Sequence, residues 1–175
     1  MTLPELAERI RAVAYLEGDF TLRSGKKSTF YIDKYLFETR PDILAEVGRR
    51  LAERRSARTT LIAGAELGGV ALAAAAAMAC GLPFAIIRNA KKEYGTTKMY
   101  EGKLSPGDVV LLVEDIATTG GQVLEAANVI RAQGAAVEKI VAVVDRGQGA
   151  ADNIRAAGLE FEAILNSANL RLPSD

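Results

Sequence analysis

The sequence predicts an α/β fold in which a central parallel β-sheet is flanked by helices. From residue 59 onward, short runs rich in Val, Ile and Leu alternate with segments whose apolar residues recur at helical spacing. Such alternation is typical of β–α–β units, whose strands lie parallel. The run 109–113 contains only Val and Leu, as expected of a strand that is buried on both faces. The 175 residues are enough for one domain with its own core.

The first part of the chain predicts a helix, a hairpin and a second helix. Apolar residues recur at helical spacing over 3–16, and Gly18 is expected to close that helix. Short apolar pieces alternate with a Ser-Gly-Lys-Lys turn over 20–36, which indicates a small hairpin of strands. Thr39 is a candidate N-cap for a helix over 41–55, which carries a proline in its first turn.

The alternation predicts the remaining elements. They are a strand at 59–63, a loop at 64–68, a helix at 69–80, a strand at 84–88, a long loop at 89–107, a strand at 109–113, a helix at 120–133, a strand at 138–144, a helix at 149–157 and a strand at 160–165. The residues after Leu165 predict a short helical tail. We find no linker and no internal repeat, so we expect a single domain over 1–175. Within it, residues 1–40 would form an N-terminal lobe over a core of residues 41–175.

Composition excludes several classes of function. Lys plus Arg and Asp plus Glu number 22 each, and this zero net charge argues against general binding to nucleic acid or to an anionic membrane. The sequence has no His, which removes Ser-His, Cys-His and His-metal chemistry. Cys80 lies in an Ala-rich stretch and is expected to be a buried, reduced thiol. The N-terminus does not resemble a signal peptide and the apolar run 70–80 is too short to span a bilayer, so we expect a cytoplasmic protein.

The most informative segment begins where the apolar run 109–113 ends. Glu114 and Asp115 come directly after that run, and Ile116-Ala117-Thr118-Thr119-Gly120-Gly121-Gln122 leads into a predicted helix. The acids can accept hydrogen bonds from sugar hydroxyls, while N–H groups and threonine hydroxyls at a helix N-terminus favour a phosphate. The segment therefore predicts a ribose 5-phosphate site. The alternative is an ordinary buried strand with a charged turn, in which the two acids would be desolvated without a partner.

Three other segments follow predicted strands, and each leaves two interpretations open. The first is a glycine-rich segment, Gly64-Ala65-Glu66-Leu67-Gly68-Gly69. It either lets the backbone approach a ligand closely or is only a tight strand-to-helix turn. Residues 88–98 are basic and form either a lid over an anion or a solvated loop. Arg146, in Asp145-Arg146-Gly147-Gln148-Gly149, either pairs with a planar carboxylate or lies at the surface.

Four segments, in order, resemble the orotate phosphoribosyltransferases. Residues 109–122 resemble the phosphoribosyl diphosphate (PRPP) signature of type I phosphoribosyltransferases, with an apolar run, two acids, two variable residues and Thr-Thr-Gly-Gly. Residues 20–33 resemble the N-terminal hood of the orotate enzymes, 88–95 their catalytic loop, and 145–146 their orotate-binding arginine segment. The resemblance implies a type I phosphoribosyltransferase fold with a small hood. It also implies transfer of 5-phosphoribose from PRPP to orotate in pyrimidine biosynthesis, giving orotidine 5′-phosphate and diphosphate, with Mg²⁺ bound mainly through PRPP.

The same resemblance implies roles for individual residues. The catalytic residues would be Lys92, Glu114 and Asp115. The PRPP-binding residues would be Arg23, Leu67, Gly68, Arg88, Lys92, Tyr94, Glu114, Asp115, Ile116, Ala117, Thr118, Thr119, Gly120, Gly121 and Gln122. Orotate would be bound by Tyr31, Ile32, Thr118 and Arg146. Lys92 would reach the partner subunit's site, which implies a homodimer with a shared active site. No dedicated metal ligands are expected from the protein.

The sequence also departs from the family pattern. Tyr94 stands where the family loop usually has His, Asn89 where it often has Lys, and Gly68 where the diphosphate loop often has Lys. Lys91 and Lys98 are the nearby basic residues that would compensate. Two alternatives to the orotate enzyme stay open at this point. One is a purine-type phosphoribosyltransferase, and the other is a regulator that binds PRPP without turnover.

Overall fold

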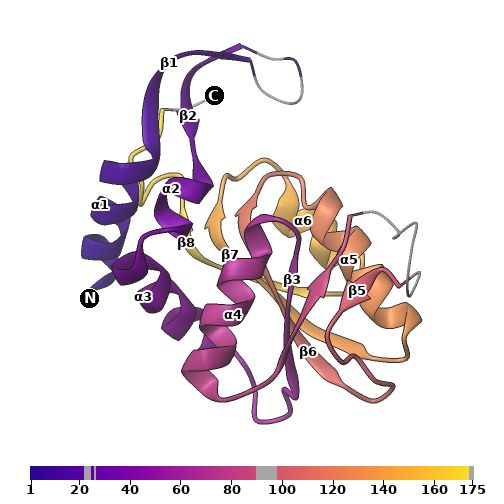
Figure 1. Ribbon diagram of the computed structural model, residues 1–175. Helices are drawn as coiled ribbons and strands as arrows, with labels where there is room; N and C mark the ends of the chain where they lie inside the picture. Colours follow the sequence, from indigo (N-terminus) through magenta and orange to yellow (C-terminus); the bar gives the residue numbers. More distant parts are fainter. Residues whose placement is uncertain (22–24, 26, 90–97, 174–175) are drawn as a thin grey trace.

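The computed structural model describes residues 1–21, 25, 27–89 and 98–173, and its centre is a six-stranded sheet (Figure 1). The strand order is β5-β4-β3-β6-β7-β8. The strands are β3 (Leu61–Ala65), β4 (Phe84–Ile87), β5 (Tyr100–Glu101), β6 (Val109–Ala117), β7 (Ala136–Asp145) and β8 (Glu160–Asn166). All neighbours pair in parallel except β4 and β5. The predicted α/β class is therefore confirmed. The short antiparallel strand β5 lies in the segment 89–107 that we expected to be all loop.

Helices cover both faces of this sheet. They are α1 (Leu3–Ala14), α2 (Lys34–Glu38), α3 (Pro41–Ala52), α4 (Gly68–Cys80), α5 (Gly121–Ala132) and α6 (Ala150–Ala156). One buried apolar cluster packs helices α1, α2, α3 and α4 against one face of the sheet. A second packs α5 and α6 against the other face. Leu111 belongs to the first cluster and Leu112 to the second, so β6 is buried on both sides. This explains why its sequence is continuously apolar rather than alternating.

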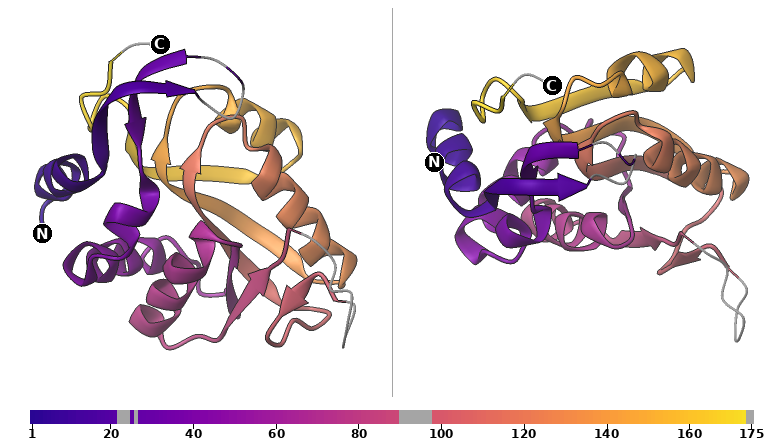
Figure 2. Two further views of the ribbon diagram at one scale, coloured as in Figure 1. Left: turned by 45° about the horizontal axis from the view of Figure 1, so that its top comes forward. Right: turned by 90° about the horizontal axis from the view of Figure 1, so that it is seen from above.

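A two-stranded hairpin of β1 (Tyr15–Thr21) and β2 (Lys27–Ile32) stands above the edge of the sheet at which β6 and β7 end (Figure 2). The predicted hairpin is present, but it begins earlier than expected. Helix α1 ends at Ala14 and β1 follows at once, so Gly18 lies inside the strand and does not close the helix. Among the described residues, no helix is long and apolar enough to cross a lipid bilayer.

Two predictions at element ends are wrong for local reasons. Thr39 ends α2, which was not predicted, and its hydroxyl donates to the Tyr35 carbonyl at 2.6 Å. The hydroxyl is therefore not used to cap α3, which follows Arg40 without a side-chain cap. The expected helical tail is a series of turns, because Asn166 and Asn169 each accept the other's backbone N–H at 2.9 Å.

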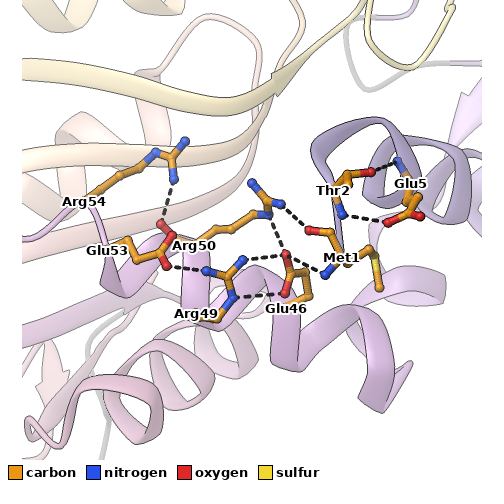
Figure 3. A network of polar contacts seen from close by, with 8 residues as sticks. All are labelled: Met1, Thr2, Glu5, Glu46, Arg49, Arg50, Glu53 and Arg54. Atoms are coloured by element: carbon orange, nitrogen blue, oxygen red, sulfur yellow. Dashed lines mark hydrogen bonds and ion pairs between the residues drawn. The ribbon is translucent and has the colours of Figure 1, made fainter.

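A polar network holds the N-terminus against α3 (Figure 3). The Arg50 guanidinium donates to the Met1 carbonyl at 2.7 Å and to the Glu46 carboxylate at 2.8 Å. Hydrogen bonds from Arg49 and Arg50 lower the pKa of Glu46. Helix α1 is also capped at its start, where Thr2 and Glu5 exchange side-chain hydrogen bonds. These contacts fix α1, and α1 leads directly into the hairpin above the sheet.

Candidate active site

A cleft of about 850 Å³ lies at the carboxyl ends of the core strands, next to the hairpin. It is lined by Phe30, Tyr31, Ile32, Lys34, Asn89, Glu114, Asp115, Ile116, Ala117, Thr118, Thr119, Gly120, Gly121, Gln122, Val123, Glu125, Arg146 and Gln148. Open α/β sheets bind ligands at this edge. The structure thus brings the whole predicted segment 114–122 together with Tyr31, Ile32 and Arg146.

The two acids of the signature lie near the end of β6 and have different surroundings. Asp115 is 3% exposed, and its carboxylate accepts a hydrogen bond from the Lys34 ammonium at 2.7 Å. Glu114 is half-buried and also lines the cleft. The partner that the desolvated acids require is therefore a lysine from α2, which the sequence analysis did not identify.

A second missed residue is Glu38, at the end of α2. Its side chain is 3% exposed, and its Oε1 atom has no hydrogen-bond partner in the described part of the chain. Burial, with a further contribution from Asp115, raises the pKa of Glu38 to about 8. Burial and Asp115 likewise raise the pKa of Glu114 to about 8. Burial acts to lower the pKa of Lys34, but the carboxylate of Asp115 outweighs it and the pKa is raised.

Hydrogen bonds from α6, and from the residues between β7 and α6, hold the loop that follows β6. The carbonyls of Ala117, Thr118 and Thr119 accept hydrogen bonds from Arg146 N, Ala150 N and Asn153 Nδ2, at 2.9, 3.0 and 2.9 Å. Gly120 has φ 80°, a conformation that favours glycine, and no side chain caps α5 at this residue. The loop carbonyls are thus occupied while α5 begins at the cleft. Uncapped N–H groups at such a helix start can bind an anion.

The glycine loop after β3 packs against the acids rather than lining the cleft. A Cβ on Gly68 would lie 1.7 Å from Asp115 Oδ2, so a larger residue would displace that carboxylate. A Cβ on Gly64 would lie 2.0 Å from the Gly69 carbonyl oxygen, so these two glycines serve a tight strand-to-helix turn. Leu67 is 67% exposed, and its peptide bond with Glu66 is cis. The interpretation as a strand-to-helix turn therefore holds for Gly64 and Gly69, while close approach of this loop to a ligand stays a prediction.

Arg88 also lies outside the cleft lining, within a polar network that joins three loops. Its Nη1 atom lies 3.9 Å from a Glu66 carboxylate oxygen and 3.6 Å from one of Glu101. Asn89 N donates to the Glu66 carboxylate at 2.8 Å, and Gln122 Nε2 donates to the Glu66 carbonyl at 3.2 Å. Glu66 thus connects the ends of β3 and β4 with the start of α5.

The hairpin provides an aromatic wall opposite the loops. Phe30, which was not predicted, is 4% exposed, and the Arg146 guanidinium carbon lies 5.2 Å from the centre of its ring. Tyr31 is 42% exposed and Ile32 is 4% exposed. A ring stacked on a guanidinium keeps a flexible arginine in place. The residues predicted to frame the pyrimidine, with Thr118, therefore share one cleft.

Arg23, Lys92 and Tyr94 lie outside the described residues, as does Lys91. Lys98 is described, and its ammonium lies 5.3 Å from the centre of the Tyr100 ring.

Comparison with known proteins agrees with this geometry. The model of the phosphoribosyl transferase domain family matches residues 37–157. An orotate phosphoribosyltransferase from Methanocella arvoryzae is 42% identical over 168 residues, which cover 96% of this chain and 95% of that protein. The chain belongs to the orotate phosphoribosyltransferase family.

Two further relatives of this family are similar over nearly the full length. The orotate phosphoribosyltransferase of Halobacterium salinarum is 42% identical over 167 residues, 95% of this chain and 95% of that protein. The crystal structure of the Mycobacterium tuberculosis orotate phosphoribosyltransferase in complex with PRPP superimposes with a TM-score of 0.81 at 31% identity. It covers 97% of this chain and 99% of that one. The family resemblance and the predicted type I phosphoribosyltransferase fold are therefore confirmed.

Proposed function

We propose that this chain transfers the 5-phosphoribosyl group from PRPP to orotate, giving orotidine 5′-phosphate and diphosphate in pyrimidine biosynthesis. The observation that carries the proposal is the cleft, in which a pair of acids, an uncapped helix start and an arginine face one another. These groups suit the ribose hydroxyls, the 5-phosphate and the orotate carboxylate, in that order. Family membership supports the same activity.

In the proposed reaction, N1 of orotate forms a bond to C1 of the ribose as the bond from C1 to diphosphate breaks. Positive charge develops on the sugar, as in other glycosyl transfers. N1 of orotate ionises readily, so the chain needs no general base. The work of the protein is to position the two substrates and to stabilise charge as the diphosphate leaves.

We assign the residues of the cleft to these tasks. Glu114 and Asp115 hold the ribose hydroxyls, and residues 117–122 hold the 5-phosphate. Arg146 pairs with the orotate carboxylate while stacked on Phe30. The N-terminal residues 1–40 then act as a lobe that provides the wall over the pyrimidine, and residues 41–175 act as the PRPP-binding core.

We propose that Mg²⁺ enters with PRPP, held mainly by oxygens of the diphosphate and ribose. Glu114 and Asp115 offer the oxygen donors that Mg²⁺ prefers, and both line the cleft. No group of three or more His, Cys, Asp or Glu in the described part of the chain is arranged to hold a metal ion, so the substrate would supply the other ligands. When bound, the ion would add positive charge beside the leaving diphosphate.

We also propose a cytoplasmic homodimer in which Lys92 reaches the partner subunit's site. The support for this arrangement is the likeness of residues 88–95 to the family's catalytic loop, together with family membership. Lys92 would then stabilise charge on the departing diphosphate.

The test is to follow orotate consumption by absorbance in the presence of PRPP and Mg²⁺. The proposal predicts loss of orotate, with equal amounts of orotidine 5′-phosphate and diphosphate formed. Adenine, guanine and xanthine should give no product with PRPP, since they offer Arg146 no carboxylate. Turnover of a purine instead would indicate a purine-type enzyme. Binding of PRPP with no product from any base would indicate a regulator.

A further inference from the structure

Lys34 lies where the acid pair meets the glycine loop. It is the first residue of α2, and its ammonium is 2.7 Å from Asp115 Oδ2. The same ammonium is 3.2 Å from the point at which a Cβ on Gly68 would lie. One cation from the N-terminal part of the chain therefore binds the acid at the end of β6 and lies close to the start of α4.

The side chain of Lys34 is also open to the cleft. It is 29% exposed, against 4% for the side chain of its partner Asp115, and it lines the cleft. An ammonium carries three donors. Among the described residues, only Asp115 accepts a hydrogen bond from it. Its remaining donors are therefore available to a group bound in the cleft.

We propose that Lys34 binds the diphosphate group of PRPP, at the point where the diphosphate joins the ribose. The inference rests on the proposed function and adds a substrate-binding cation to it. The neighbours of Lys34 decide which end of PRPP it meets. It contacts Asp115 and approaches Gly68, whereas the loop assigned to the 5-phosphate lies beyond Asp115, at residues 117–122. Gly68 leaves room for the Asp115 carboxylate that holds this ammonium, because a Cβ there would lie 1.7 Å from Asp115 Oδ2 and 3.2 Å from Lys34 Nζ.

The competing explanation is that Lys34 only orients Asp115. Binding of two ligands separates the two roles, because ribose 5-phosphate lacks the diphosphate that PRPP carries. Calorimetric titrations with Mg²⁺ would measure both dissociation constants for the wild type and for Lys34→Met. If Lys34 binds diphosphate, affinity for PRPP falls about ten- to hundredfold, while affinity for ribose 5-phosphate changes less than threefold. Equal losses for both ligands, or no loss, would overturn the proposal.

Two further variants keep the experiment decisive. Lys34→Met leaves Asp115 buried without its cation, so the same substitution is also made in Asp115→Asn, where no unpaired charge remains. In that background Lys34→Met should still lower the affinity for PRPP about tenfold. If the affinity falls no further than in Asp115→Asn alone, Lys34 acts only through Asp115. The matched control is Lys139→Met, which removes a lysine paired with Glu162 on β8 and should leave both constants unchanged. Wild-type protein that does not bind PRPP would contradict the proposed function itself rather than the role of Lys34.

Discussion

Replacing Glu38 with Gln should remove a pH dependence of folding stability that this buried carboxyl creates. Glu38 is 3% exposed and has an unpartnered oxygen, and burial raises its pKa from 4.5 to about 8. Between those pH values the native state keeps a proton that the unfolded chain has released. Stability therefore falls as pH rises through this window, because the native state binds more protons than the unfolded state.

The magnitude follows from the width of the window. Each proton held only by the native state lowers the free energy of unfolding by about 1.4 kcal/mol per pH unit. Between pH 5.5 and 7.5, Glu38 should therefore destabilise the wild type by roughly 3 kcal/mol. Gln has nearly the same shape and stays neutral, so the stability advantage of Glu38→Gln over the wild type should grow by roughly 3 kcal/mol between pH 5.5 and 7.5. Glu114, whose pKa is also raised to about 8, leaves a residual slope in the variant.

Urea unfolding at several pH values between 5.5 and 8.5, followed by circular dichroism, measures this difference. Glu46→Gln is the matched control, because Arg49 and Arg50 lower the pKa of Glu46 and its titration lies below the window. That variant should lose a constant amount of stability across the range. Wild-type and Glu38→Gln curves that run parallel from pH 5.5 to 8.5 would refute the reasoning, because Glu38 would then be ionised in the native state throughout.

Three further predictions concern substrate binding and the shared site. Arg146→Ala should raise the KM for orotate far more than the KM for PRPP in steady-state assays; equal changes would make Arg146 a structural residue. Gly68→Ala should lower the affinity for PRPP about tenfold or more in titrations, because the new Cβ displaces the Asp115 carboxylate. An affinity equal to that of the wild type would contradict this. Mixing Lys92→Ala with Asp115→Asn subunits should restore about a quarter of wild-type activity, since half the dimers have one intact site. No recovery after verified subunit exchange would contradict the shared site.

Much of the core was predictable because each element carries its own signal. Strand β6 is buried on both sides, so its apolar run is continuous, and the following glycines and threonines mark the start of α5. The order of the core strands and helices follows from their alternation. The first 40 residues were harder to predict, because α1 leads into β1 without a turn residue. Helix α2 is only five residues long, too short to show helical periodicity.

The missed helix α2 is also the reason that Lys34 and Glu38, which lie near Asp115, were not identified from the sequence. The sequence alone indicates that Glu114 and Asp115 need a partner, since two adjacent acids at the end of a buried strand are costly to desolvate. It cannot identify the partner, because Lys34 is 81 residues away in the chain. Lys34 and Glu38 are four residues apart, which places them on one face of a helix, but only once α2 is known to be a helix. The packing of α2 therefore sets the charge around Asp115.

Phe37 lies between Lys34 and Glu38 in α2. Its side chain is fully buried in the core and anchors this helix. Truncation of Phe37 should therefore disturb PRPP binding even though the cleft lining does not include this residue.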